Sequence, residues 1–284
     1  MFRHLLAGLT ALSLLLAAAP ASAGIYYSAK THIEAEGGQP QDMDVEAWVD
    51  GPKAKILFRE SNNPITPEGS YLLTQDGGEN LFLVNPEEKT YTRWDLDALV
   101  KSVGSAMDAM KGVVSFEISD PEVEKLVDED GGTLLGLPTR HTRFRTTYSM
   151  RMRILGIKRQ ADTETVQDMW TTTAVDDSAL RVWLRKVPAS TGNEQLDKLM
   201  KSEMSQVDGL PLKVVAKTTS TSGKKNRTST STTTTEVTTF EKRAVPEGTF
   251  NLPEGYTETQ MVPQGEDGKE DGGNPFSRLL KGGG

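Results

Sequence analysis

The residues of this chain that could do chemistry are few and widely separated. Beyond the N-terminal segment the chain has two histidines, His32 and His141, and it has no cysteine at all. A histidine can act as a general base, but neither histidine belongs to an H-x-x-x-H or other metal-ligand spacing. His32 falls among polar strand positions and His141 has basic neighbours, so we interpret both as solvent-exposed strand residues. The lack of cysteine excludes thiol catalysis, cysteine-bound metals and disulfides.

One acidic run could bind a hard cation such as calcium. Asp128-Glu129-Asp130-Gly131-Gly132 clusters three carboxylates, and calcium prefers such oxygen ligands. The run lacks the spacing and the liganding glutamate of an EF-hand loop, so we prefer to interpret it as a charged turn. The chain also has no G-x-S-x-G element, phosphate-binding glycine loop or dinucleotide fingerprint. We therefore expect a protein that is not an enzyme and that has no cofactor or metal.

The N-terminal segment has the layout of a secretory signal. Arg3 supplies a positive charge, residues 5–19 are apolar, and Ala21-Ser22-Ala23 is a small-x-small cleavage site. No cysteine follows the expected cut after Ala23, and no later apolar run approaches the roughly 20 residues of a membrane span. These features predict a periplasmic protein without a lipid anchor, with an extracellular location as the alternative. The formal net charge of −8 argues against nucleic acid or an anionic membrane surface as a partner.

Most of the chain after the signal alternates between apolar and polar residues, a pattern typical of strands with one buried face. Turn residues such as Gly37-Gly38-Gln39-Pro40 and Asp50-Gly51-Pro52 separate these stretches and predict an antiparallel meander. The threonine-rich residues 228–239 are expected to form a solvent-facing strand. The arginine-rich residues 140–159 favour a solvated strand face, although they could meet an acidic partner such as a phospholipid head group.

Two segments have helical periodicity instead. Residues 95–111 and 194–207 carry apolar residues at spacings of three and four, which predicts two amphipathic helices. Each helix must bury its apolar stripe, and the sheet is the simplest surface for this.

Several motifs resemble those of the LolA/LolB-like lipoprotein carriers of the bacterial periplasm. The motifs are Ala47-Trp48-Val49-Asp50-Gly51-Pro52, the T-Q-D-G-G-E-N-L-F-L-V-N-P run over residues 74–86, and Phe250-Asn251-Leu252-Pro253-Glu254-Gly255-Tyr256. The chain is still more similar to exported bacterial relatives of unknown function. The resemblance implies a mainly β fold, an unclosed antiparallel β half-barrel with two amphipathic helices on its concave face. It does not extend to lipoprotein transfer, because carriers have an arginine where this chain has Gly51, and they begin with a helix.

In the carriers, the space between sheet and helices accepts acyl chains. We therefore expect a cleaved signal over residues 1–23, one half-barrel domain over 24–262 and a disordered tail over 263–284. The expected function is an exported binding protein that holds an acyl chain or another apolar ligand. The side chains expected to line its cavity are Trp48, Phe58, Tyr71, Phe82, Trp94, Leu96, Val103, Met107, Met110 and Tyr148.

The alternative is a structural or envelope-interaction protein with no small-molecule ligand, in which the same side chains simply fill the core. The expected partners are a lipid or lipoprotein acyl chain in the first case. In the second case, the partner is an envelope protein that binds the C-terminal tail.

Overall fold

The computed structural model describes residues 23–63, 66–94, 114–154, 157–175, 191, 193–223 and 227–259. The expected signal, the first expected helix and the expected tail lie outside these residues. The strands are β1 (Ala23–Ala35), β2 (Gln41–Asp50), β3 (Lys53–Ser61), β4 (Tyr71–Thr74), β5 (Leu81–Asn85), β6 (Thr90–Trp94), β7 (Val114–Ile118), β8 (Glu122–Leu134), β9 (Leu137–Ile154), β10 (Ile157–Thr172), β11 (Leu210–Ser222), β12 (Arg227–Ala244) and β13 (Thr257–Thr259), and the helix is α3 (Glu194–Met204).

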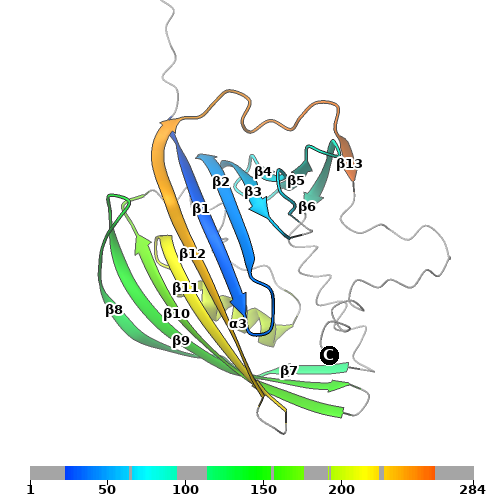
Figure 1. Ribbon diagram of the computed structural model, residues 1–284, viewed down its shortest axis with the longest axis vertical. Helices are drawn as coiled ribbons and strands as arrows, with labels where there is room; N and C mark the ends of the chain where they lie inside the picture. Colours follow the sequence, from blue (N-terminus) through cyan, green and yellow to red (C-terminus); the bar gives the residue numbers. More distant parts are fainter. Residues whose placement is uncertain are drawn as a thin grey trace, which may run out of the picture.

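All the strands join in one large unclosed sheet. Its order is β13-β6-β5-β4-β3-β2-β1-β12-β11-β10-β9-β7, and β8 also pairs with β9. Every pairing is antiparallel except that of β13 with β6. Figure 1 shows that the sheet is strongly bent and that α3 lies behind β11 and β12, inside the bend. The mainly β, unclosed architecture expected from the sequence is therefore confirmed.

The meander expected in the first third of the chain is confirmed as β1 to β6, which are neighbours in sequence order. Asp50 pairs with Lys53, so Gly51 and Pro52 alone make the turn between β2 and β3. Gly51 has φ +56, a left-handed conformation that costs little only for glycine. The last strand of this meander, β6, pairs with β13, and its first strand, β1, pairs with β12.

The acidic run was wrongly interpreted as a turn, because it lies within β8. The strand continues through Asp128, Glu129 and Asp130, and its register with β9 shifts at a bulge between Asp130 and Gly132. The turn comes later, between Leu134 and Leu137, which pair with each other. The bulge requires a residue without a Cβ at Gly131. A Cβ there would lie 2.7 Å from Thr139 Oγ1 and 2.9 Å from the backbone nitrogen of His141.

The two faces of the sheet carry different apolar clusters, because successive side chains of a strand point to opposite faces. We call the face that carries Leu212 and Tyr148 the inner face. Its buried cluster is made of Ile25, Val49, Ala54, Val175, Leu210 and Leu212. We call the opposite face the outer face, and its buried cluster is made of Tyr71, Leu73, Val84 and Phe250. The chain after β12 covers this second cluster with Val245, Phe250, Leu252 and Tyr256.

The second of the two expected helices is confirmed as α3. Asn193 caps it, and its side chain accepts hydrogen bonds from the backbone N–H groups of Gln195 and Leu196, as preferred N-cap residues do. Among its residues only Leu199 is buried, so the helix is lightly anchored. In the described part of the chain, no helix is long and apolar enough to cross a membrane.

Candidate functional site

The inner face of the sheet carries a band of partly exposed aliphatic and threonine side chains. Residues that lie opposite each other in antiparallel strands share a face, so the register defines a band across β2, β1, β12 and β11. The side chains of this band are half-exposed, whereas the inner-face cluster at the other end of the same strands is buried. We call this half-exposed surface the inner band, and it consists of Thr31, Ile33, Met43, Val45, Val214, Ala216, Thr233 and Thr235.

Threonine and serine hydroxyls on the inner face bind one another across the strands. The Oγ1 atoms of Thr31 and Thr235 are 3.0 Å apart, and those of Thr165 and Thr218 are also 3.0 Å apart. A hydroxyl with a hydrogen-bond partner costs little to remove from water, whereas one without a partner is expensive to bury. The paired threonines therefore leave their methyl groups available for contact with an apolar ligand.

Helix α3 attaches to the edge of the sheet, at β7 and at the segment that follows it. The Ile118 backbone N–H donates to Oε1 of Gln195 over 2.9 Å, and Lys198 Nζ lies 3.3 Å from a carboxylate oxygen of Asp120. Burial raises the pKa of the Tyr148 hydroxyl on β9, and the negative charge of Glu203 on this helix raises it further. The polar contacts of the helix are thus with one edge of the sheet.

The structure divides the side chains expected to line a cavity between the two faces of the sheet. Phe58 and Tyr148 lie on the inner face, since Phe58 pairs with Val45 and Tyr148 pairs with Thr163. Trp94 pairs with Leu81, which alternates with outer-face Phe82 and so lies on the inner face as well.

The other described members of the predicted lining belong to the outer face. Tyr71 is part of the buried outer-face cluster, and Trp48 and Phe82 pack against that cluster. The remaining members, Leu96, Val103, Met107 and Met110, lie outside the described residues. The described members therefore do not come together in one place. The role of the whole set in ligand binding stays a prediction.

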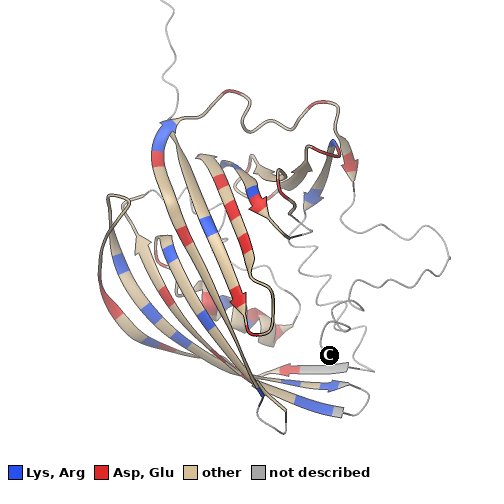
Figure 2. Ribbon diagram, in the orientation of Figure 1, with Lys and Arg blue, Asp and Glu red and all other residues tan. Residues whose placement is uncertain are grey.

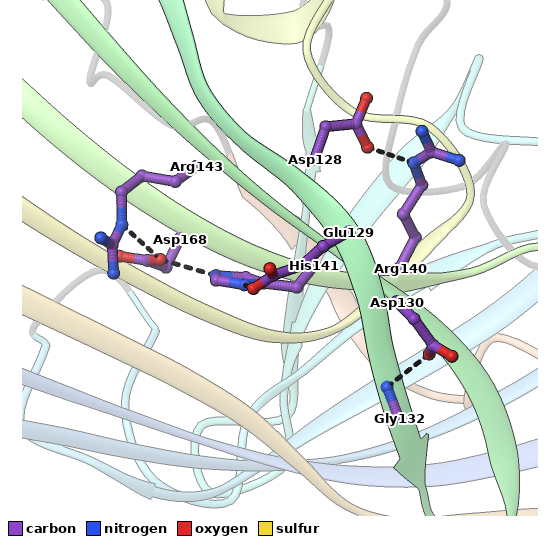
Figure 3. Close-up of polar contacts among 8 residues, drawn as sticks. All are labelled: Asp128, Glu129, Asp130, Gly132, Arg140, His141, Arg143 and Asp168. Atoms are coloured by element: carbon purple, nitrogen blue, oxygen red, sulfur yellow. Dashed lines mark hydrogen bonds and ion pairs between the residues drawn. The ribbon is translucent and has the colours of Figure 1, made fainter.

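His141 is much less exposed than expected for a surface strand residue. Only 12% of its side chain is accessible, and it joins three strands on the outer face. Its Nδ1 lies 3.0 Å from a carboxylate oxygen of Glu129 on β8, and its Nε2 lies 2.7 Å from Oδ1 of Asp168 on β10. The same Asp168 oxygen accepts a hydrogen bond of 2.8 Å from Nε of Arg143. Figure 3 shows these four side chains together, with Asp128 and Arg140 as a separate pair nearby.

The geometry of this cluster indicates a structural role. Both ring nitrogens of His141 face carboxylates, so neither is free to take a proton from a substrate. Partial burial lowers the pKa of His141, but the hydrogen bonds with Glu129 and Asp168 outweigh this effect and raise it. Among the described residues, no group of three or more His, Cys, Asp or Glu side chains could hold a metal ion. The cluster is therefore an ion-pair network that links β8, β9 and β10.

Sequence reasoning missed Glu129 and Asp168 as partners of His141. The register of the β9–β10 hairpin places Asp168 opposite Arg143 and Trp170 opposite His141. That register follows from the pairing of Ile154 with Ile157. Placing this pair would have identified Asp168 as the acidic neighbour of Arg143, whereas Glu129 depends on the bulged pairing of β8 with β9.

Three solved structures are similar to the chain at low identity. A LolA superfamily protein from Nitrosomonas europaea is 9% identical, with a TM-score of 0.30, over 81% of this chain and 91% of that chain. An uncharacterized conserved protein from Thermus thermophilus is 6% identical, with a TM-score of 0.33, over 82% and 90% of the two chains. A DUF1329 family protein from Desulfovibrio piger is 11% identical, with a TM-score of 0.25, over 78% and 87%.

Likenesses at these TM-scores carry no argument about function, which must come from the chain's own surfaces. No curated protein matches the chain. The expected similarity to proteins of unknown function is confirmed, because residues 151–256 match DUF4412, a domain of unknown function.

Proposed function

We propose that this protein is an exported binding protein that holds an acyl chain or another apolar ligand on the inner band, beside α3. Its location in the periplasm is part of the proposal and is supported by the signal-like N-terminal sequence. The ligand is held by burial of apolar surface, which yields about 25 cal/mol for each Å² removed from water.

The observation that carries the proposal is the half-exposed state of the inner band. In a packed β protein, the inward-facing side chains of central strands are buried against another layer. Here Ile33, Val45 and Val214 remain half-exposed, although β1, β2 and β11 all lie in the interior of the sheet order. A surface of this kind, with partly open aliphatic side chains among threonines on central strands, supports the assignment of a binding site.

The chemistry of the band favours a flexible apolar ligand. Its threonine hydroxyls are paired in part with each other, and its charged neighbours point to the outer face, as the pairing of Lys30 with Asp44 shows. Met43 adds an adaptable side chain that can follow ligands of different shape. Such a surface offers many methyl contacts and few fixed polar groups, and this combination suits a hydrocarbon chain.

Two neighbouring valines allow a sharp test. Val214 lies on the inner band, and Val215 lies on the outer face of the same strand; both are half-exposed. We expect Val214→Asn to weaken the binding of a dansylated fatty acid about tenfold, because burying an amide without a partner costs about 1–3 kcal/mol. The matched variant Val215→Asn should leave this affinity unchanged. Fluorescence titration of the purified, delipidated protein measures both.

A second measurement covers ligands that the probe does not resemble. Mass spectrometry of organic extracts should detect a bound lipid in the wild-type protein and less of it in Val214→Asn. If the protein binds no fatty acid, phospholipid or lipopeptide and yields no extracted lipid, the proposal fails. The structural or envelope-interaction role without a small-molecule ligand would then be favoured.

A further inference from the structure

The arginine-rich part of β9 and β10 divides into two regions with different electrostatics. In the first region, each arginine has a carboxylate on a neighbouring strand. Arg143 lies 2.8 Å from Asp168, and Arg145 lies 3.1 Å from Glu124. Arg140 is paired with Asp128. These cations are neutralised within the sheet.

The second region, at the end of the β9–β10 hairpin, is not neutralised in this way. Arg151, Arg153, Lys158 and Arg159 are exposed, and we call these four residues the basic tip. No ion pair joins any of them to another residue in the described part of the chain. A hollow of about 480 Å³ lies beside the four cations, and among its described lining residues the one acidic residue is Glu117 on β7, which pairs with Arg151 in the register.

The register of the basic tip brings like charges together. Arg153 pairs directly with Lys158, and Arg151 pairs with Gln160 beside them, so these three cationic side chains share one face. Like charges directly opposite each other in an antiparallel pair destabilise a sheet. A bound anionic surface would remove this repulsion.

The basic tip also projects from the body of the sheet. The pairing of β10 with β11 begins at Ala161 and Ser222, so residues 157–160 pair with β9 alone. Figure 1 shows the ends of β9 and β10, with β7, extending past the other strands, and Figure 2 shows that Lys and Arg dominate these ends. The net charge of −8 is a total over the whole chain, and it does not describe this end of the hairpin, where four cations lie together.

We propose that the basic tip docks the protein on an anionic phospholipid bilayer. Arg151, Arg153 and Lys158 lie on one face of the hairpin, whereas Arg159 pairs with Met152 on the other. Four cations at the end of a projecting hairpin, with no ion-pair partner in the described part of the chain, suit the extended array of phosphates at a bilayer surface.

The test is co-sedimentation of the full chain with lipid vesicles in low salt. One set of vesicles contains phosphatidylglycerol and phosphatidylcholine, and the other contains phosphatidylcholine alone. We expect binding to the anionic vesicles only. Arg153→Gln/Lys158→Gln should weaken it about 30-fold, since each basic residue at an anionic membrane surface contributes about fivefold in affinity.

A matched variant controls for the loss of two charges. Lys53→Gln/Lys242→Gln removes two exposed lysines from the opposite end of the strands and should bind vesicles like the wild type. Val214→Asn should also bind them normally, because bilayer docking and ligand binding use different surfaces. Vesicle binding by Val214→Asn therefore reports on the docking proposal alone, and fatty-acid binding by the same variant reports on the proposed function.

Three results would overturn the docking proposal. They are equal binding to neutral vesicles, equal weakening by the two double variants, and no vesicle binding by the wild type. Saturable binding of inorganic phosphate at the basic tip without vesicle binding would reassign the tip to a small-anion site. A double variant that loses its circular-dichroism melting transition is replaced by the single substitution Lys158→Gln, which keeps one charge of the pair.

Discussion

The imidazole of His141 stacks on the indole of Trp170, with ring centroids 4.4 Å apart and an angle of 9° between the ring planes. The two residues lie directly opposite each other on β9 and β10. On the far side of Trp170, Lys213 Nζ lies 5.8 Å from the indole centroid. A protonated imidazole gains from contact with an electron-rich aromatic face, so the stack and the two carboxylates favour the same charged form of His141.

We expect His141→Gln to lower the free energy of unfolding by about 1–3 kcal/mol at pH 6, as the loss of a buried charged hydrogen bond does. The pKa of His141 is raised in the folded protein, so its contribution is fully present below the unfolded value of about 6.5. The contribution is lost as the pH rises through the raised pKa. Urea unfolding of both proteins at pH 6 and pH 9 should show a smaller difference at pH 9.

His32 is the natural control for this prediction. It also lies between two carboxylates, Asp42 and Glu34, and their hydrogen bonds raise its pKa. Its side chain is 45% exposed, so solvent screens the interaction. His32→Gln should change stability less than His141→Gln at pH 6. Equal effects of the two substitutions, or an effect of His141→Gln that does not depend on pH, would contradict the proposed network.

Gly209→Ala should destabilise the protein much more than Gly223→Ala. Both glycines have positive φ, +84 and +75, so an alanine at either position costs about 1–2 kcal/mol in backbone strain. At Gly209 a Cβ would also lie 2.6 Å from the Thr172 carbonyl oxygen, whereas at Gly223 nothing lies within 4 Å. Thermal melting of both variants measures the difference, and similar melting temperatures would show that β11 can shift away from β10 at little cost.

The strands were predictable because their periodicity is a local signal. The alternation in β1 and β2 and the turn at Gly51-Pro52 are each visible in a few residues. The helical spacing of apolar residues in α3 is a local signal of the same kind. The bulge in β8 was not predictable in the same way. Asp128, Glu129 and Asp130 followed by two glycines have turn-like composition, and only pairing with β9 shows that they continue a strand.

The candidate sites were harder to predict than the fold. Trp48 and Phe58 both have the residue type of a cavity lining, but the register places them on opposite faces of the sheet. A shift of one residue in a strand moves a side chain to the other face. The division of the arginines into neutralised and unpaired regions is likewise invisible in sequence, because their carboxylate partners come from β8 and β10.

Leu212→Ala should cost about 2–5 kcal/mol of unfolding free energy, because a fully buried leucine leaves both lost contacts and a cavity. Leu212 is 1% exposed in the inner-face cluster. Leu135→Ala removes the same atoms from a position that is 42% exposed and should change stability by at most about 0.5 kcal/mol. Chemical denaturation compares them. A small effect at Leu212 would mean that the cluster does not hold the strand ends together.

The cap of α3 links stability to the proposed ligand site. Asn193→Ala removes the acceptor for the Gln195 and Leu196 backbone N–H groups and should cost about 1 kcal/mol. Asn193→Asp keeps an acceptor and should cost much less. Because only Leu199 of α3 is buried, the loss should appear first as faster hydrogen exchange in the helix, while the exchange of β9 and β10 stays slow.

If α3 covers the bound acyl chain, Asn193→Ala should also release the dansylated fatty acid faster in stopped-flow experiments, and Asn193→Asp should not. An unchanged release rate, together with faster exchange in the helix, would show that ligand exit does not depend on α3.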